Sequence, residues 1–281
     1  MSFVKQKTLK SAISFQGIGL FTGASTSLRL IPAPENTGIV FKRVDLQATP
    51  SILAHVEAAD AGMRCTRIGS QDKGIQTVEH LLSALHAFGV CNVFIELDGP
   101  EVPILDGSAL FFSQKIIEVG CEEQGDRPVY HLQEPVFFSQ GETHIVAIPS
   151  HELRMSYTLH YPESSLLSSQ FYSVVINEHS FLQEIAPCRT FSLYEEIAPF
   201  IASGLVKGGS LDNAVIVKEG KVMNEGGLRF PDEMVRHKIL DLLGDLALIN
   251  RSFLAHVIAI RSGHRSNIAF AKEMLRKMEN T

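Results

Sequence analysis

The residues best suited to chemistry lie together in a segment with the pattern of an amphipathic helix, EMVRHKILDLLGDLALI over residues 233–249. At about 100° per residue, its aliphatic residues fall on one side. The other side carries four polar residues: His237, Lys238, Asp241 and Asp245. Because residues i and i+4 lean the same way one turn apart, His237 and Asp241 form a natural bidentate site for a metal ion. The alternative is that this polar side is a solvated surface.

A second group of candidates stands at the start of another predicted helix. The segment TVEHLLSALHAF begins with a capping residue, Thr77, and has an acidic residue in its first turn. A hydrolytic zinc takes three protein ligands and keeps one position open for water. His80 is a candidate for the third ligand, and Glu79 beside it is a candidate base for the water's proton. The alternative is that Glu79 only stabilises its helix N-terminus and that His80 is a partly buried histidine.

His264 is a further candidate because it follows a glycine in a loop, Ser-Gly-His, after a predicted strand over 253–260. Glycine lets the backbone approach a site closely, and loops after strands often carry catalytic groups. A carboxylate such as Asp245 could hold the imidazole protonated. The alternative is that His264 only opens the last predicted helix.

The elements that must position these residues follow the same order in both halves of the chain: helix, strand, loop and helix. The first half has HLLSALHAF, NVFIEL and ALFFSQKIIEV, and the second has HKILDLLGDLAL, FLAHVIAI and IAFAKEMLRKM. This repeat indicates a duplicated α+β unit. The polar segment EEQGDRP (122–128) is typical of a linker, so we expect domains over 1–126 and 127–281.

Composition excludes several classes of protein. The 281 residues carry 25 Lys+Arg against 31 Asp+Glu, a formal charge of −6, which argues against a nucleic-acid partner. The four cysteines are far apart and form no CxxC pair, as in a reduced cytosolic protein. No apolar stretch approaches about 20 residues, and the N-terminus has no signal-peptide core. We therefore expect a soluble, cytoplasmic protein without a transmembrane segment.

Several motifs together resemble a known family. In chain order they are TVEHLLSAL (77–85), PEVPILDGSA (100–109), CRTFSL (188–193), RHKILDLLGDL (236–246) and SGH (262–264). With the N-terminal segment from KQKTLKSAIS to TGIVFKR (5–43), they look like the UDP-3-O-acyl-N-acetylglucosamine deacetylase family. The resemblance extends over nearly the whole chain. Common templates such as HExxH, GxSxG and the P-loop are absent.

The resemblance implies a zinc amidase of two similar α+β domains, each a β-sheet with helices, with the helices packed between the two sheets. The site would lie between the domains. His80, His237 and Asp241 would be the zinc ligands, and Glu79 would be the general base. The family also carries an apolar passage for the 3-O-acyl chain in its second domain, where this chain has residues 192–217.

The resemblance also implies roles for five further residues. His264 would be a protonated acid held by Asp245. Thr190 would supply a hydroxyl to the developing oxyanion. Lys238 would act in catalysis and help to bind the anionic part of the substrate, and Phe191 would line the sugar or acyl site.

The implied reaction is hydrolysis of the N-acetyl group of UDP-3-O-acyl-N-acetylglucosamine to UDP-3-O-acyl-glucosamine and acetate. This is the committed step of lipid A biosynthesis in Gram-negative bacteria. Histidine and carboxylate ligands also suit Fe²⁺, so iron is an alternative metal. The residues by themselves are also compatible with a zinc hydrolase of another amide, or with a non-catalytic sugar-nucleotide or lipid-binding protein. A site between two domains of one chain needs no partner subunit, so we expect a monomer.

Overall fold

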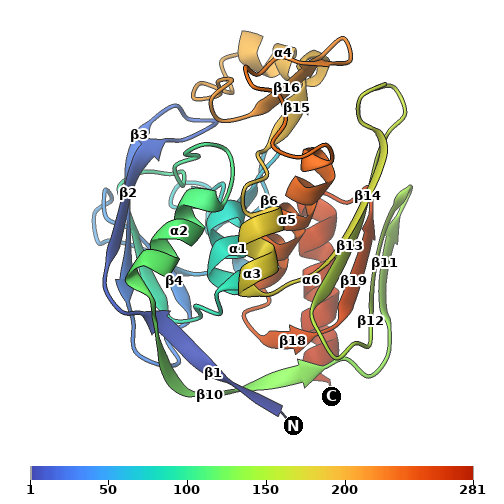
Figure 1. Ribbon diagram of the computed structural model, residues 1–281. Coiled ribbons are helices and arrows are strands. Elements are labelled where there is room, and N and C mark those ends of the chain that lie inside the picture. Colours follow the sequence, from blue (N-terminus) through green and yellow to red (C-terminus); the bar gives the residue numbers. More distant parts are fainter. Residues whose placement is uncertain (1, 281) are drawn as a thin grey trace.

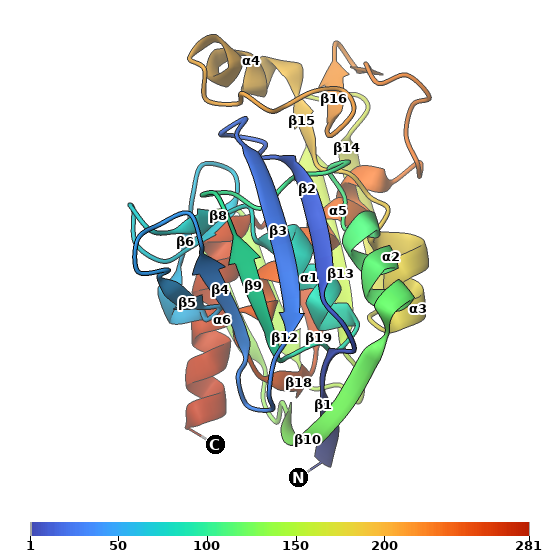
Figure 2. The same ribbon diagram turned by 90° about the vertical axis from the view of Figure 1, so that its left-hand side faces the viewer.

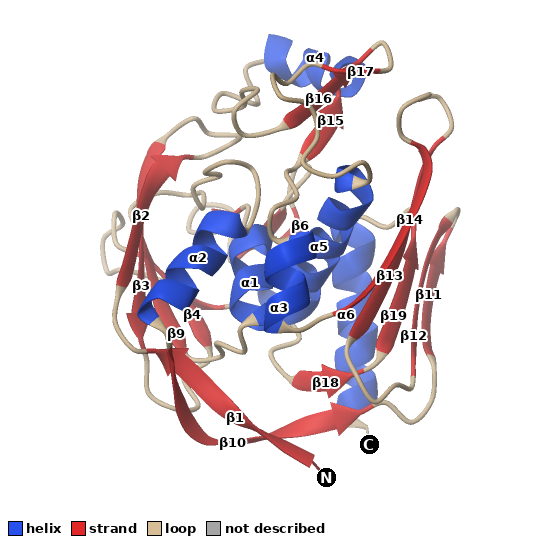
Figure 3. Cartoon of the chain, in the orientation of Figure 1, coloured by secondary structure: helices blue, strands red, loops and turns tan. Residues whose placement is uncertain are grey.

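Two five-stranded sheets enclose a layer of helices in the computed structural model, which describes residues 2–280 (Figure 1, Figure 3). The first sheet has the order β2 (Ile13–Ile18), β3 (Ser25–Pro32), β9 (Val93–Leu97), β4 (Ile39–Arg43) and β5 (Ser51–Leu53). The second has the order β11 (Val136–Gln140), β12 (Thr143–Ile148), β19 (His256–Ile260), β13 (Arg154–Tyr161) and β14 (Ser168–Val175). Each sheet contains one parallel pair, β4 with β9 and β13 with β19. When the five strands of each sheet are numbered in chain order, both sheets have the same spatial order, 1-2-5-3-4.

The residue pattern of the strands explains why each sheet covers the core with one face. Successive side chains of a strand point to opposite faces, so alternation buries one face and leaves the other in contact with solvent. In β3, Leu28 and Leu30 are buried while their neighbours Ser27 and Arg29 are exposed. Figure 2 shows the first sheet in front of the helices that it covers.

Five helices form the layer between the sheets: α1 (Glu79–Ala87), α2 (Leu110–Val119), α3 (Glu178–Ser180), α5 (Glu233–Ala247) and α6 (His264–Glu279). The two most deeply buried are α1 and α5, which pack against each other. All of α5 is buried except Arg236 and Lys238. The arrangement confirms the predicted α+β fold with helices between two sheets.

A three-stranded sheet joins the two halves at one end of the molecule. It consists of β1 (Ser2–Leu9), β10 (Cys121–His131) and β18 (Ser252–Leu254), with β10 antiparallel to β1 and parallel to β18. The polar segment 122–128, which we expected to be a linker, therefore lies inside a strand. A strand with only one buried residue needs no apolar alternation, so its composition resembles that of a loop. The division into domains at residue 126 stays a prediction.

Two smaller sheets stand near the ends of the helices. One consists of β6 (Ala59–Ala61), β7 (Thr66–Ile68) and β8 (Ile75–Gln76), preceded by a 3₁₀ turn at Val56–Ala58. The other consists of β15 (Phe191–Leu193), β16 (Val215–Lys218) and β17 (Lys221–Val222), and with α4 (Tyr194–Ala202) it lies above the helical layer in Figure 1. A π-helical turn, Phe181–Ile185, follows α3. None of the described helices is both long and apolar enough to cross a membrane.

Candidate active site

The start of α1 and the middle of α5 touch, and this contact builds the site. A methyl group added at Gly244 of α5 would lie 2.1 Å from the carbonyl oxygen of Glu79 in α1. Only a residue without Cβ lets the two helices approach this closely. The polar side of α5 predicted from the sequence therefore faces the start of α1 inside the protein, and the alternative of a solvated surface is wrong.

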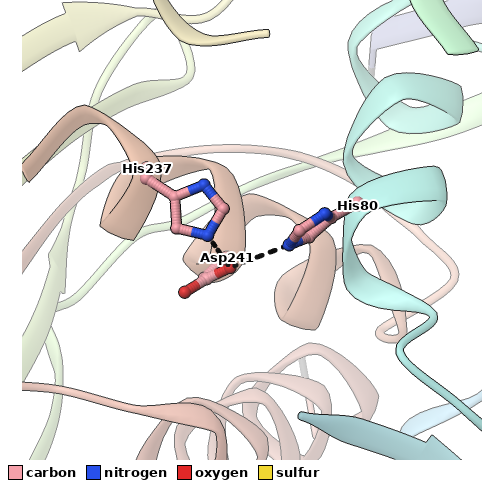
Figure 4. A group of neighbouring side chains, drawn as sticks. All are labelled: His80, His237 and Asp241. Atoms are coloured by element: carbon pink, nitrogen blue, oxygen red, sulfur yellow. Dashed lines mark ion pairs between the residues drawn. The ribbon is translucent and has the colours of Figure 1, made fainter. Parts of the chain in front are cut away.

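His80, His237 and Asp241 lie together, with one ligand atom from each within 4.8 Å of the others (Figure 4). Asp241 Oδ1 is 3.2 Å from His237 Nε2 and 3.7 Å from His80 Nε2. Two ligands of a tetrahedral zinc with bonds of about 2.0–2.1 Å lie about 3.3–3.4 Å apart. The spacing of these three side chains therefore fits a zinc ion held between them.

The surroundings keep His80 and Asp241 in the forms that coordinate a metal, and they orient His237 toward the site. Burial and the neighbouring His237 lower the pKa of His80 to about 3, so this imidazole is neutral. Burial alone would raise the pKa of Asp241, but Lys238, whose Nζ lies 2.6 Å from Oδ2, and His237 hold it well below its ordinary value. His237 Nδ1 faces the carbonyl oxygen of Cys188 at 3.0 Å, which turns Nε2 toward the site.

Glu79 is buried beside this group and faces in two directions. Its Oε2 accepts a hydrogen bond of 3.1 Å from the backbone nitrogen of Thr66, and its Oε1 is 3.7 Å from His264 Nε2. Burial raises the pKa of Glu79 to about 8, although the nearby His264 opposes this rise. A carboxylate with a pKa near neutral pH can accept a proton during a reaction and release it afterwards.

His264 is the first residue of α6, and its side chain faces Asp245 in the interior. Its Nδ1 lies 3.0 Å from Asp245 Oδ2, and the same oxygen accepts a hydrogen bond of 2.8 Å from Asn267 Nδ2. Burial alone would lower the pKa of His264, but Asp245 and Glu79 together raise it to about 9. The imidazole is therefore protonated at neutral pH.

Thr190 and Phe191 come from the segment that leads into β15. The backbone nitrogen of Thr190 donates to the carbonyl oxygen of Gly107 over 2.8 Å, which fixes its position. The Phe191 ring stacks edge to face on His237 and on Tyr161, with centroids 6.3 Å apart in both pairs. Both residues therefore border the space in front of His237.

A cavity of about 1250 Å³ opens over these residues. Every residue that the sequence suggested for the site lines it except Asp245, which lies behind His264. The part of its wall between residues 192 and 217 is mainly apolar: Leu193, Ile197, Ile201, Val206, Leu211, Ala214 and Ile216. One cavity therefore has a polar floor and an apolar extension.

Sequence reasoning missed two residues that contact Asp245. Asn267 follows His264 by three residues, and this spacing on one helix face could have indicated it. Thr66, whose hydroxyl also donates to Asp245, lies in β7, 13 residues before Glu79 at the start of α1. No local signal in the sequence indicates Thr66.

Comparisons with known proteins agree on one family. Residues 6–276 match the family model LpxC, described as UDP-3-O-acyl N-acetylglycosamine deacetylase. The chain is 46% identical to the UDP-3-O-acyl-N-acetylglucosamine deacetylase of Chlamydia pneumoniae over 279 residues, which is 98% of each chain. It is 47% identical to the protein of the same name from Chlamydia felis over 277 residues, again 98% of each.

Proposed function

Since the chain belongs to the family of UDP-3-O-acyl N-acetylglycosamine deacetylases, we propose that it hydrolyses the N-acetyl group of a UDP-3-O-acyl-N-acetylglucosamine. The products are the free sugar amine and acetate, and the reaction belongs to lipid A biosynthesis. One observation carries this proposal: a carboxylate and a protonated imidazole flank a three-residue metal site on the floor of one cavity. Amide hydrolysis needs these three elements because water is a poor nucleophile and an amine is a poor leaving group.

We propose that His80, His237 and Asp241 hold Zn²⁺, with Fe²⁺ as the alternative metal. Their two nitrogens and one oxygen form the donor set of a hydrolytic zinc site that keeps a position open. When bound, the metal supplies Lewis-acid activation of water and of the amide carbonyl. Lys238 balances the charge of Asp241 from the other side of the carboxylate.

Glu79 and His264 divide the proton transfers between them. Glu79 accepts the proton of the attacking water, for which it must be ionised. His264 is charged at neutral pH and donates its Nε2 proton to the departing amine. The 3.7 Å between Glu79 Oε1 and His264 Nε2 lets both groups reach one reacting centre. Asp245 keeps the imidazole oriented through Nδ1.

Thr190, Phe191 and Lys238 border the space that the sugar would occupy. The Thr190 hydroxyl is proposed to donate to the oxygen of the tetrahedral intermediate. The ammonium group of Lys238 would attract the anionic part of the substrate. The Phe191 ring offers an apolar face to the sugar or the acyl chain.

The apolar extension of the cavity offers a place for the acyl chain of the substrate. We propose that the segment 192–217 forms the passage for this chain, because its aliphatic side chains line the wall beyond Phe191. Burying the acyl chain there contributes about 0.8 kcal/mol per CH₂ group.

We further propose that the protein acts as a cytoplasmic monomer with its site between domains 1–126 and 127–281. Every side chain of the site comes from one chain, which supports a monomer. Light scattering after gel filtration measures the mass in solution. A mass near 31 kDa agrees with the 30.9 kDa chain, whereas twice that value contradicts the proposal.

Acetate release tests the function directly. The purified protein is incubated with UDP-3-O-acyl-N-acetylglucosamine as isolated, after chelation and after Zn²⁺ is restored. We expect turnover, loss on chelation and recovery with zinc. UDP-N-acetylglucosamine without the acyl chain is the matched control, and it should react much more slowly. A folded, zinc-loaded sample without turnover contradicts the proposed substrate.

A further inference from the structure

Thr66 contacts three of the residues to which we assign roles in proton transfer. It is fully buried in β7. Its backbone nitrogen donates to Glu79 Oε2 over 3.1 Å. Its hydroxyl donates to Asp245 Oδ1 and lies 3.1 Å from His264 Nδ1. Thr66 thus contacts the proposed base, Glu79, through its backbone. It contacts the proposed acid, His264, and its partner Asp245 through its neutral hydroxyl.

The single hydrogen of this hydroxyl decides the direction of the hydrogen bonds around it. Asp245 Oδ1 can only accept, so the Thr66 hydrogen points to that oxygen. The hydroxyl then presents a lone pair to His264 Nδ1. The other contact of Nδ1 is with Asp245 Oδ2, also an acceptor, at 3.0 Å. Nδ1 faces two acceptors and therefore carries a hydrogen. The Nε2 of His264 is left facing Glu79 and the cavity.

We propose that the Thr66 hydroxyl is a positioning group that fixes the carboxylate of Asp245 and, through it, the ring of His264. The proposal rests on the proposed function, because it concerns the residue assigned as the acid of that reaction. The Thr66 hydroxyl contacts Asp245 and His264, and Thr66 does not line the cavity, so the hydroxyl acts through these two residues.

The backbone of Thr66 is held independently of its hydroxyl. β7 pairs with β6 through Thr66 and Ala61 and with β8 through the two following residues. The carbonyl oxygen of Thr66 also accepts from the backbone nitrogen of Val78 over 3.4 Å. Replacing Thr66 by valine, which has nearly the same shape, therefore removes the hydroxyl and leaves the bond to Glu79 in place.

The first measurement compares Thr66→Val with Thr66→Ser. We expect valine to lower kcat about tenfold, the effect of about 1.4 kcal/mol lost from the transition state, with KM unchanged. Serine keeps the hydroxyl and should restore kcat to within about threefold of the parent. Zinc content and Tm are recorded for each variant, and Thr66→Ala replaces the valine variant if that variant does not fold. Equal kcat in Thr66→Val and the parent overturns the proposal.

The second measurement asks whether Thr66 acts through His264. In a His264→Ala background, Thr66→Val should change kcat less than twofold, because the group that it orients is gone. A tenfold loss that persists in this background means that Thr66 has a general structural role, and it overturns the proposal. Enzyme concentrations high enough for single-turnover conditions make the slow His264→Ala reaction measurable.

The third measurement needs no turnover. In ¹⁵N NMR of histidine-labelled, zinc-loaded protein, the Nδ1–H resonance of His264 is assigned by its loss in His264→Ala. We expect this proton to exchange at least tenfold faster in Thr66→Val than in Thr66→Ser. Equal exchange overturns the positioning role. A parent protein that releases no acetate but shows the exchange difference contradicts the proposed function and leaves the positioning role supported.

Discussion

Gly244 sets the distance between the two helices that carry the proposed metal ligands, so Gly244→Ala tests the construction of the site. The added methyl would lie 2.1 Å from the carbonyl oxygen and 2.7 Å from the carbonyl carbon of Glu79. Contacts below 3.0 Å are not tolerated, so the helices must separate by about 0.9 Å. Both nearest atoms belong to backbone, which cannot rotate away.

Separating the helices changes one distance between the proposed metal ligands and leaves another unchanged. His237 and Asp241 share α5, so their 3.2 Å spacing is kept. The 3.7 Å between Asp241 and His80 spans the two helices and would lengthen toward 4.6 Å. That distance exceeds the roughly 3.4 Å of a tetrahedral zinc site. We expect zinc affinity to fall by at least about 10–100-fold. This is the loss typical of metal sites in which only a hydrogen-bond partner of a metal ligand is mutated.

The free energy of unfolding of the metal-free protein should change much less than the zinc affinity. Overpacking costs about 1–3 kcal/mol, and the higher helix propensity of alanine returns about 1 kcal/mol. The net loss is about 0–2 kcal/mol. Zinc affinity is measured by competition with a chromophoric chelator, and stability by denaturant unfolding without metal. Gly244→Val, with a larger side chain, should lower both further. Unchanged zinc affinity in Gly244→Ala would refute the reasoning.

The remaining predictions concern protons, charge and metal. Glu79→Gln and His264→Ala should each keep bound zinc, measured by elemental analysis, and lose at least about 100-fold in kcat; normal turnover in either contradicts its role. The metal-free protein should lose stability as pH rises from about 6.5 to about 9, because folding raises the pKa of His264 from 6.5 to about 9 and the folded state alone holds that proton. The rise in the pKa of Glu79 from 4.5 to about 8 acts in the same direction, and unfolding at a series of pH values should show a smaller slope above pH 7 in His264→Ala. Lys238→Met should raise KM about tenfold or more, since a half-buried cation proposed to attract the anionic part of the substrate is lost; an unchanged KM contradicts this role and leaves Lys238 as a partner of Asp241 alone.

The parts of the site that the sequence could predict are those built within one helix. His237 and Asp241 are one turn apart, and the period of the helix alone places them side by side. Glu79 and His80 are adjacent at a helix start, and the structure has that start at Glu79. The pairing of His264 with Asp245 across two helices follows from the chemistry of the two groups, and their atoms lie 3.0 Å apart.

The parts that escaped the sequence depend on contacts between distant segments. Thr66 reaches Asp245 only because β7 lies against the helices, and a lone threonine in a short strand has no periodic signal. The segment 122–128 is polar because none of its residues is buried, so composition alone could not separate it from a loop. The predicted strand 253–260 is divided at Ala255, because its two parts pair with different sheets.

The three-stranded sheet of β1, β10 and β18 has a consequence for how the chain folds during synthesis. β1 begins at Ser2, pairs with a strand that ends at His131, and that strand pairs in turn with Ser252–Leu254. The β10 strand of the first half therefore lacks one of its two neighbouring strands until residues 252–254 have left the ribosome. Despite two sheets of the same strand order, we infer that the halves unfold in one cooperative transition rather than in two.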